Sequence, residues 1–411
     1  MTSLTTILFP LLAQVWDVAI RWAPLWAPIV VIYLAIVMWF RYIRARFLRD
    51  KPWVLLEIKL PKQIDKTPQA MELAMGVFYQ TRDHGNLLID GWVKGETRTW
   101  FSLEIASFSG DIHFYVRTDK FFKNLIESQL YAQYPGIEIF EVDDYVDNIS
   151  FGLPGSDWDL WATDYKLAKE DVLPIKTYID YGMDKIVEEE NKVDPMTAMI
   201  EYLGTVGANQ QVWIQILAMA AKDRYKKEGK VFSKEGWTAQ GKRKVDELMK
   251  RDKKGGDDEK ANFGELMLSP GERKGVENAE RNLGKLGFDC GIRGMYLYRR
   301  DVFTPLNIVG LLGAFKQYAS AGSNGFKAAF KTAFNYPWQD PFGWRLARRK
   351  RIFFDAYRRR SWFYPPYQRT PFVLSAEELA TIFHFPGQVA GTPTLPKIES
   401  KRAVPPENLP V

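Results

Sequence analysis

The densest group of chemically active side chains is the segment RLARRKRIFFDAYRRRSWFYPPYQR at 345–369. Nine basic residues stand here against one acid, Asp355, among several aromatic residues. Cationic side chains bind phosphates and carboxylates, and aromatic rings stack on bases. The segment is therefore a candidate docking site for a protein partner, for nucleic acid or for anionic lipid headgroups, although an exposed helix packed on an acidic neighbour has the same composition. The candidate docking residues are Arg345, Arg348, Arg349, Lys350, Arg351, Arg358, Arg359, Arg360, Trp362 and Tyr364.

Residues that support metal binding or catalysis are few. His84, His113, His384 and the lone Cys290 form no close pair of ligands, so we expect no transition-metal site. The acidic run EVDDYVDN at 141–148 lacks the alternating acids and glycine of a calcium loop and is predicted to be a loop leaving a strand. Neither GLLGAFKQ nor GSNGFKAA fits a phosphate-binding loop, and no GxSxG motif occurs. The sequence therefore predicts a protein that is not an enzyme and needs no cofactor.

Composition favours a folded protein in a reducing compartment. The chain has 411 residues, of which 46% are hydrophobic and 14% aromatic, so it can build packed cores. Its net charge of +6 is mild for this length, and a single cysteine cannot form an internal disulfide.

An apolar run, WAPLWAPIVVIYLAIVMWF, lies between Arg21 and Arg41. Its length as a helix approaches the roughly 30 Å of a bilayer's hydrocarbon core. Aromatic and basic residues flank the run in the positions that anchor a membrane helix, and Pro28 is expected to kink the helix or mark its regular start. The expected anchor residues are Trp22, Trp26, Trp39, Tyr42, Arg41, Arg44, Arg46 and Arg49.

The basic flank predicts the orientation of the anchor. Positive residues after a span are retained in the cytoplasm, so we expect a single-pass protein of the cytoplasmic (inner) membrane with its C-terminal body in the cytoplasm. Residues 4–20 are also apolar and are interpreted as an interfacial or partner-packing helix; the alternative is a second span that forms a hairpin with the first.

The body is expected to be an α+β structure. A strand at 53–60, a helix from Pro68, strands at 99–107 and 111–118, a helix at 119–134 and a strand at 136–142 give the order βαββαβ of a ferredoxin-like module. A second, related module is predicted from strands at 173–180, 210–220 and 290–300, with helices after Asp194 and after a capping box at 269–272.

These patterns divide the chain into five parts. Residues 1–50 are the anchor with its basic flank, 51–148 the ferredoxin-like module, and 149–320 the second α/β module with a charged, mobile insertion at 222–262. Residues 321–374 hold the basic aromatic segment. Residues 375–411 hold a short helix, opened by the capping box SAEE, and a proline-rich tail.

Several phrases resemble a known family. WFSLEI, YAQYPGIEIFEVDDY, LGFDCGIRGMYLY and EELATIFHFPG with TPTLPKIESKRAVPPENLP are similar to the membrane-proximal region of coupling-type ATPases of type IV secretion and conjugative DNA transfer, particularly from candidate-phyla bacteria. The similarity covers roughly residues 50–411. In that family the proline-rich stretch leads into a P-loop motor, whose nucleotide-binding residues have no counterpart here, so the resemblance implies the anchoring and docking half alone.

The expected function is a non-catalytic structural or adaptor subunit of a secretion-like or conjugation-like apparatus. Its expected partners are the membrane, other subunits of the apparatus, a separate P-loop ATPase and further copies of itself. The alternative is a membrane-tethered protein that binds nucleic acid during DNA uptake or transfer.

Overall fold

The computed structural model describes most of the chain. The described residues are 14, 16–18, 20–61, 64, 66–80, 90–152, 155–184, 193–221, 223, 225–226, 234–249, 269–320, 322–334, 336–387 and 397–398. Two compact units divide the chain: Met1–Lys51 with Arg82–Arg98, and Pro52–Thr81 with Thr99–Val411. The chain therefore leaves the second unit between its first two strands and then returns to it.

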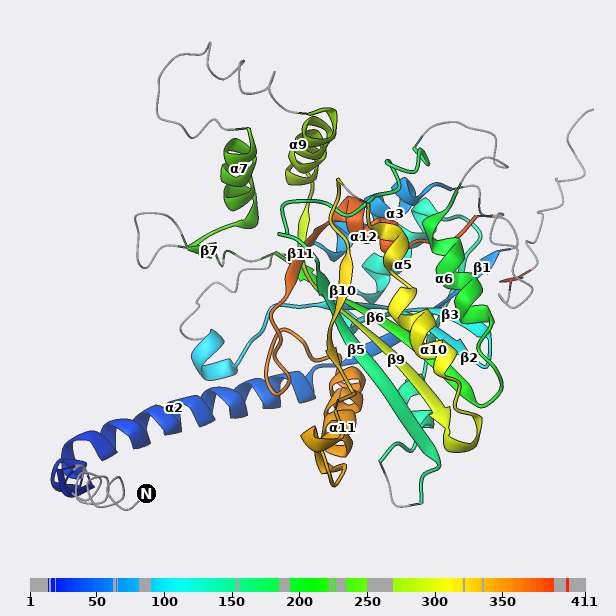
Figure 1. Cartoon of the computed structure of the whole chain (residues 1–411). Helices are drawn as coiled ribbons and strands as arrows, with labels where there is room; N and C mark the ends of the chain where they lie inside the picture. The colour runs from blue at the N-terminus through cyan, green and yellow to red at the C-terminus, as the bar shows by residue number, and fades with distance from the viewer. Residues whose placement is uncertain are drawn as a thin grey trace, which may run out of the picture. The chain divides into compact units, whose positions relative to one another are not determined.

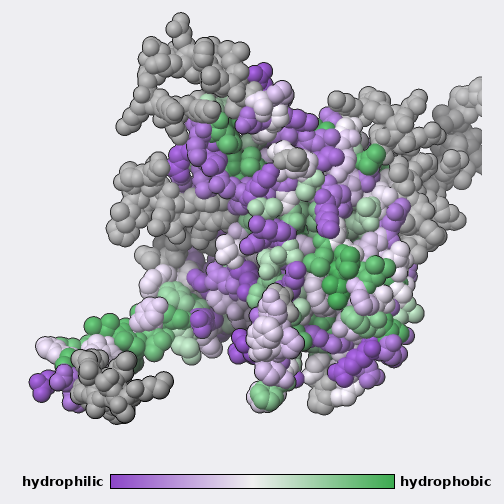
Figure 2. Space-filling model, in the orientation of Figure 1, coloured by the Kyte–Doolittle hydropathy of each residue, from purple (hydrophilic) through white to green (hydrophobic). Residues whose placement is uncertain are grey.

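The first unit contains helix α2 (Ala23–Asp50), drawn in blue in Figure 1. Among the described helices, α2 is the one long and apolar enough to cross a membrane, and Figure 2 shows hydrophobic residues along it. Pro24 lies in its first turn and Pro28 lies inside it, so the helix begins before Pro28. The expected anchor aromatics Trp22, Trp26, Trp39 and Tyr42 are exposed, and the expected basic flank, Arg41 to Arg49, belongs to the same helix. The apolar run at 4–20 lies mostly outside the described residues.

The second unit is built on one large sheet (Figure 1). Nine of its strands pair antiparallel, and a tenth, β12, pairs parallel with the end of β1, counting the described residues. The strands are β1 (Trp53–Pro61), β2 (Phe101–Phe108), β3 (Asp111–Asp119), β4 (Glu138–Val142), β5 (Trp158–Leu167), β6 (Gln210–Ala220), β9 (Gly287–Arg299), β10 (Phe326–Lys331), β11 (Phe372–Ser375) and β12 (Lys397–Ile398).

One strand order occurs twice in this sheet. The N-terminal half runs β4-β1-β3-β2 and the C-terminal half runs β10-β5-β9-β6, so each half has its first strand between its fourth and third. The halves join where β2 pairs with β6, from Phe101 opposite Ala218 to Phe108 opposite Gln211. The sheet is thus continuous through the two regions in which the sequence predicted a ferredoxin-like module and a second, related module.

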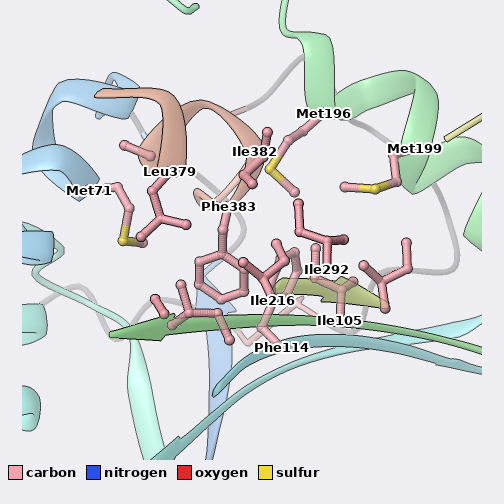
Figure 3. Packing of buried hydrophobic residues seen from close by; sticks show 14 of the residues in the cluster. Met71, Ile105, Phe114, Met196, Met199, Ile216, Ile292, Leu379, Ile382 and Phe383 are labelled. Atoms are coloured by element: carbon pink, nitrogen blue, oxygen red, sulfur yellow. The ribbon is translucent and has the colours of Figure 1, made fainter. Parts of the chain in front are cut away.

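Helices cover the two faces of the sheet unequally. One face carries α3 (Pro68–Met75), α5 (Lys123–Gln133), α6 (Pro195–Gly204), α10 (Pro305–Gly313) and α12 (Ala376–Ile382). Figure 3 shows side chains of α3, α6 and α12, among them Met71, Met196 and Leu379, over strand residues such as Phe114. The other face carries α11 (Trp344–Arg358). Strand alternation divides neighbours between these faces: Ile105 faces the larger core and Ala106 the smaller one.

Local signals in the sequence placed many elements correctly. Ser109 and Gly110 have φ of 55° and 97° and form the β2–β3 turn. The capping boxes at Ser269 and Ser375 are both present and open α9 (Pro270–Leu283) and α12. Each satisfies amide groups that a helix N-terminus otherwise leaves without partners.

The expected strand at 173–180 is wrong. This segment forms turns, and the first strand of the C-terminal half is β5, which lies earlier in the chain. Its amides bond elsewhere: Ile175 N donates to the Glu378 carboxylate at 2.9 Å and Lys176 N donates to the Tyr318 carbonyl. The backbone amides of this segment thus form hydrogen bonds with residues distant in sequence, in place of the strand pairing that its apolar pattern suggested.

Part of the charged insertion lies within the described residues. Within 222–262 the structure describes helix α7 (Trp237–Leu248), preceded by the short strand pair β7 (Tyr225–Lys226) and β8 (Lys234–Glu235). α7 packs against α9 through Val245, Val276 and Ala279, where Gly241 leaves room for Leu283. The prediction of a mobile arm is therefore wrong for this helix, while residues 222, 224, 227–233 and 250–262 lie outside the described residues.

Candidate functional site

Helix α11 presents the basic segment as one face of a helix. Gly343 adopts a left-handed φ of 71° just before the helix, and the Asp340 carboxylate accepts hydrogen bonds from Leu346 N at 2.7 Å and Arg345 N at 3.3 Å. Asp340 therefore satisfies free amides of the first turn and places a negative charge at the positive end of the helix dipole.

The opposite face of α11 is buried on the sheet. Phe353, Phe354 and Tyr357 pack with Trp213 and Leu160 in the smaller core. Arg345, Arg348 and Arg351 recur every three residues and are exposed. This spacing keeps them on one face. Within the described part of the chain no acid lies within ion-pair distance of Arg348 or Arg351, so their charges are available to a partner.

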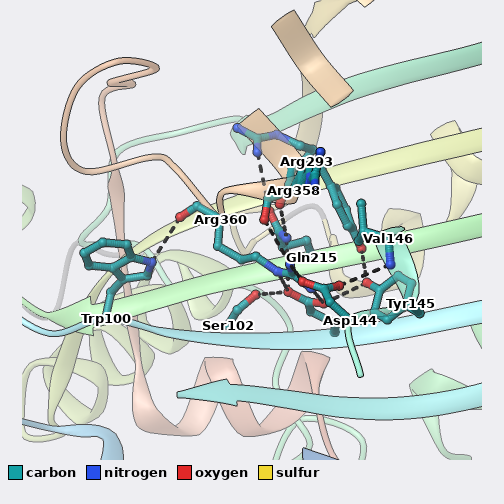
Figure 4. Close-up of polar contacts among 11 residues, drawn as sticks. Trp100, Ser102, Asp144, Tyr145, Val146, Gln215, Arg293, Arg358 and Arg360 are labelled. Carbon is teal, nitrogen blue, oxygen red and sulfur yellow. Dashed lines mark hydrogen bonds and ion pairs between the residues drawn. The ribbon is translucent and has the colours of Figure 1, made fainter. Parts of the chain in front are cut away.

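A buried ion-pair network fixes the C-terminal end of α11 (Figure 4). Arg360, which is 0% exposed, donates from Nε and Nη2 to the two oxygens of Glu104, at 2.9 and 3.0 Å. The same guanidinium pairs with Asp144 and donates to the Arg358 carbonyl at 2.9 Å. Its own carbonyl accepts from Trp100 Nε1 at 3.0 Å. Arg360 thus ties α11 to β2 and to the loop after β4.

The network around Glu104 is satisfied by further donors. Tyr145 Oη donates to Glu104 at 2.7 Å, and Gln215 Nε2 donates to it at 3.1 Å. Burial alone raises the pKa of Glu104, but the charge of Arg360 and the hydrogen bonds of Arg360, Ser102 and Tyr145 outweigh it and lower the pKa to about 2. Burial raises the pKa of Tyr145 and Tyr357 well above the ordinary value. The network thus carries charge but is enclosed in the protein interior.

A second buried pair lies beside the first. Arg293 of β9 donates to Asp164 of β5 at 3.1 Å, and its guanidinium lies 5.1 Å from the centre of the Trp362 ring. Burial raises the pKa of Asp164 despite the charges of Arg293 and Arg369. Gly291 makes this arrangement possible, because a Cβ there would lie 2.2 Å from the Trp362 ring.

Two residues of the predicted docking set are therefore corrected. Arg360 and Trp362 are buried. Arg360 pairs with Glu104 and Asp144, and the ring of Trp362 lies against Arg293, so both residues stabilise the fold and are not exposed to a partner. Tyr364 is half-buried, with its hydroxyl 3.9 Å from Met219 Sδ. Lys350, Arg358 and Arg359 form ion pairs with Asp159, Asp147 and Asp355, respectively. Arg345, Arg348, Arg349 and Arg351 carry the available charge.

A pocket of about 400 Å³ opens beside these arginines. The Arg349 guanidinium lies over the Phe334 ring at 4.1 Å and the Phe330 ring at 4.7 Å, and Nη1 donates to the carbonyls of Lys331 and Ala333. Burial and the charge of Arg345 lower the pKa of Arg349. Repelling cations beside an aromatic wall make this pocket suited to an anionic group. Its lining also includes Arg345, Arg348, Ile352, Pro366, Tyr367, Gln368 and Arg369.

Four exposed aromatic residues precede and begin α11. Tyr336 and Trp338 stack with ring centres 4.5 Å apart, and Phe342 and Trp344 stack at 5.4 Å. Trp338, Phe342 and Trp344 are each more than two-thirds exposed. We call these four aromatics, with Arg345, Arg348, Arg349 and Arg351, the α11 surface. Exposed aromatic clusters of this kind mark interaction sites.

Sequence reasoning missed the partners that organise this surface. Glu104 is the charged residue of strand β2, where it stands among apolar residues and two serines, and only its position at a buried strand site could have marked it. The acidic run at 141–148 contains a strand end and a short 3-10 turn, where Asp144 accepts from Val146 N and also pairs with Arg360. Because Asp144 pairs with a residue more than two hundred positions away, the local sequence around it does not indicate the pair.

The histidines and the cysteine that the structure describes lie apart from one another. Cys290 is buried, His113 Nδ1 lies 2.6 Å from Glu57, and His384 Nε2 lies 3.1 Å from Asp194, while His84 is outside the described residues. Across the described residues no group of three or more histidines, cysteines or acids could hold a metal ion.

Comparison with known proteins places the chain in a family. The family model described as "Domain of unknown function (DUF8128)" matches residues 45–397, and the chain belongs to this family. No curated protein matches the chain.

Proposed function

We propose that this member of the DUF8128 family is a non-catalytic, membrane-anchored adaptor subunit of a type IV secretion-like or conjugation-like apparatus. The observation that carries the proposal is the α11 surface, where arginines without an ion pair among the described residues stand on a helix held by a buried ion-pair network. A surface fixed in this way recognises a partner with little loss of conformational entropy.

The proposed anchor is helix α2, crossing the cytoplasmic membrane once. Its apolar part precedes Arg41, Arg44, Arg46 and Arg49, which are retained on the cytoplasmic side of a membrane. The body then lies in the cytoplasm, and confinement to the membrane raises the effective concentration of neighbouring copies and favours a homo-oligomer.

The proposed scaffold consists of two ferredoxin-like modules fused side by side. The repeated strand orders β4-β1-β3-β2 and β10-β5-β9-β6 support this assignment, because each has the spatial order of four strands that is typical of a split βαβ fold. The resemblance of the chain to the membrane-proximal region of coupling-type ATPases supports the same role.

The proposed partner is an acidic surface on a separate P-loop ATPase. Arg345, Arg348 and Arg351 offer guanidinium forks suited to carboxylates, and the exposed rings of Trp338 and Trp344 supply apolar contact area. Aromatic and arginine side chains are the types that most often dominate binding energy at interfaces.

The test is a charge reversal on this surface. Full-length protein is extracted in detergent from its native cells as wild type, as Arg348→Glu with Arg351→Glu, and as the control Arg299→Glu with Lys316→Glu, which makes the same change in charge at exposed positions elsewhere. We expect a P-loop ATPase to co-purify with wild type and control, as identified by mass spectrometry, and to be lost from the first variant. Equal recovery from all three, or from none, would contradict the proposal.

A second candidate function is binding of single-stranded nucleic acid. The specific observation for it is the pair of exposed aromatic stacks next to the arginines of α11, since bases stack on such rings. Fluorescence anisotropy of labelled DNA with full-length protein would then show affinity that falls steeply with salt and is weakened by Trp338→Ala with Trp344→Ala. Absence of binding excludes this function, whereas binding that these substitutions leave unchanged excludes the α11 surface as its site.

A further inference from the structure

The segment Asp90–Arg98 lies between α3 and β2 in sequence but belongs to the same unit as helix α2. Asp90–Lys94 forms a π-helical turn, closed by a hydrogen bond from Glu96 N to the Asp90 carbonyl. Gly95 follows with φ of 69°, and a Cβ there would lie 2.6 Å from the carbonyl carbon of Ile43. Only glycine allows this close approach of the two backbones.

Two further contacts fix the turn at one level of α2. Trp92 packs edge-on against Phe40 with ring centres 4.7 Å apart, and its carbonyl accepts a hydrogen bond from Trp39 Nε1 at 3.0 Å. Ile43 is the buried residue of the helix at this level. Trp39 and Phe40 are the last residues of the apolar run, and Arg41 follows at once.

The outer side of the turn is apolar. Trp92 is 50% exposed, although Trp39 and Phe40 contact it, and Val93 is 63% exposed. A tryptophan with one polar atom and a large apolar ring favours the boundary between headgroups and acyl chains. The Asp90 carboxylate neutralises Lys94 at 2.8 Å, which lowers the cost of placing this turn near the hydrocarbon.

We propose that the Asp90–Lys94 turn is a second membrane contact, seated in the headgroup region of the bilayer with Trp92 and Val93 against lipid. The proposal rests on the membrane anchoring proposed for α2. The turn extends the aromatic belt of Trp39 and Tyr42 with a residue from another part of the chain. The lipid bilayer is the occupant because the patch continues the exposed apolar surface of the span itself.

The test measures the depth of position 93 in a bilayer. Full-length Val93→Cys protein is labelled with an environment-sensitive fluorophore and reconstituted in phosphatidylcholine–phosphatidylglycerol vesicles that carry a quencher either near the headgroup or near the acyl-chain end. Val31→Cys, which lies in the middle of the span, and Leu306→Cys, an exposed position of the body, are the comparison sites, and the parent chain measures any labelling of the buried Cys290.

We expect loss of fluorescence at position 93 with the shallow quencher, loss at position 31 with the deep quencher, and no loss at position 306. Trp92→Ala in the Val93→Cys chain should weaken the shallow quenching. If position 93 behaves like 306 while 31 is quenched, the membrane contact is wrong and the anchor stands. If 31 also escapes quenching, the anchor itself fails. Self-quenching of the fluorophore at position 93, with no response to either the shallow or the deep quencher, would assign the turn to contact between copies of the chain.

Discussion

Arg360 illustrates how one side chain can look like a surface residue in sequence and be an interior one in the fold. It closes a run of three arginines, yet Arg358 and Arg359 are exposed and Arg360 is 0% exposed. The sequence predicted where the cations concentrate but could not show which of them point inward. That choice depends on Glu104 and Asp144, which reach Arg360 only through the assembled sheet.

We expect Arg360→Ala to lower the free energy of unfolding by about 3–5 kcal/mol, because it leaves the buried charge of Glu104 without its cation. Arg359→Ala, which removes an exposed pair with Asp355, is the control and should change stability little. Urea denaturation of the detergent-solubilised full chain, followed by circular dichroism, measures both. Similar midpoints for the two variants would mean that the buried network contributes no more than a surface pair.

Glu104 also predicts how stability depends on pH. Its pKa in the folded protein is about 2, below that of an unfolded chain, so the unfolded state binds the proton first as pH falls. The stabilisation is complete above about pH 5 and is lost as pH drops toward 2. Thermal melts across this range should show a falling midpoint, with a shallower slope in Glu104→Gln. An identical slope in that variant would assign the acid sensitivity to other carboxylates.

Among the elements, strand β9 depends on glycine for its packing. Gly291 lies opposite Leu217 of β6, and the Trp362 ring covers its position on the face that carries α11. Gly291→Ala would place Cβ 2.2 Å from a rigid indole, so we expect a loss of stability of about 1–3 kcal/mol.

Gly271→Ala in α9 is the matched control for this substitution, because nothing lies within 4 Å of its added Cβ. It should leave stability unchanged or raise it, since alanine favours the helix. Differential scanning calorimetry of both variants separates the two effects. A Gly291→Ala protein as stable as the control would show that Trp362 moves aside at no cost.

Element prediction succeeded where the signal was local and failed where it was not. A pattern within a few residues predicts each of the elements that were placed correctly, such as the capping boxes, the Ser109–Gly110 turn and the strand at 210–220. The segment 173–180 has a similar apolar pattern, but its backbone amides donate hydrogen bonds to Glu378, Thr381 and Tyr318. These three residues lie much later in the sequence. The pairing of β2 with β6, which makes one sheet of two halves, has no sequence signature.

The whole chain is expected to remain with the membrane. Val31→Arg with Leu34→Arg places two charges in the middle of α2, at a cost of about 2.5–3.5 kcal/mol each for insertion. This variant should appear in the soluble fraction after alkaline carbonate extraction, while the wild type sediments with the membranes. Leu73→Arg, at an exposed position of α3 in the body, is the control and should sediment like wild type. Release of all three proteins would refute an integral anchor.

The place of helix α12 in the larger core has a consequence for biosynthesis. Leu379, Phe383 and Phe385 lie in the same core as Met71 and Phe114, and β12 pairs with β1, the first strand of the body. A nascent chain must therefore be synthesised at least as far as these segments before the core on this face is covered. A chain terminated before residue 376 would leave its methionine-rich face exposed to chaperones and proteases.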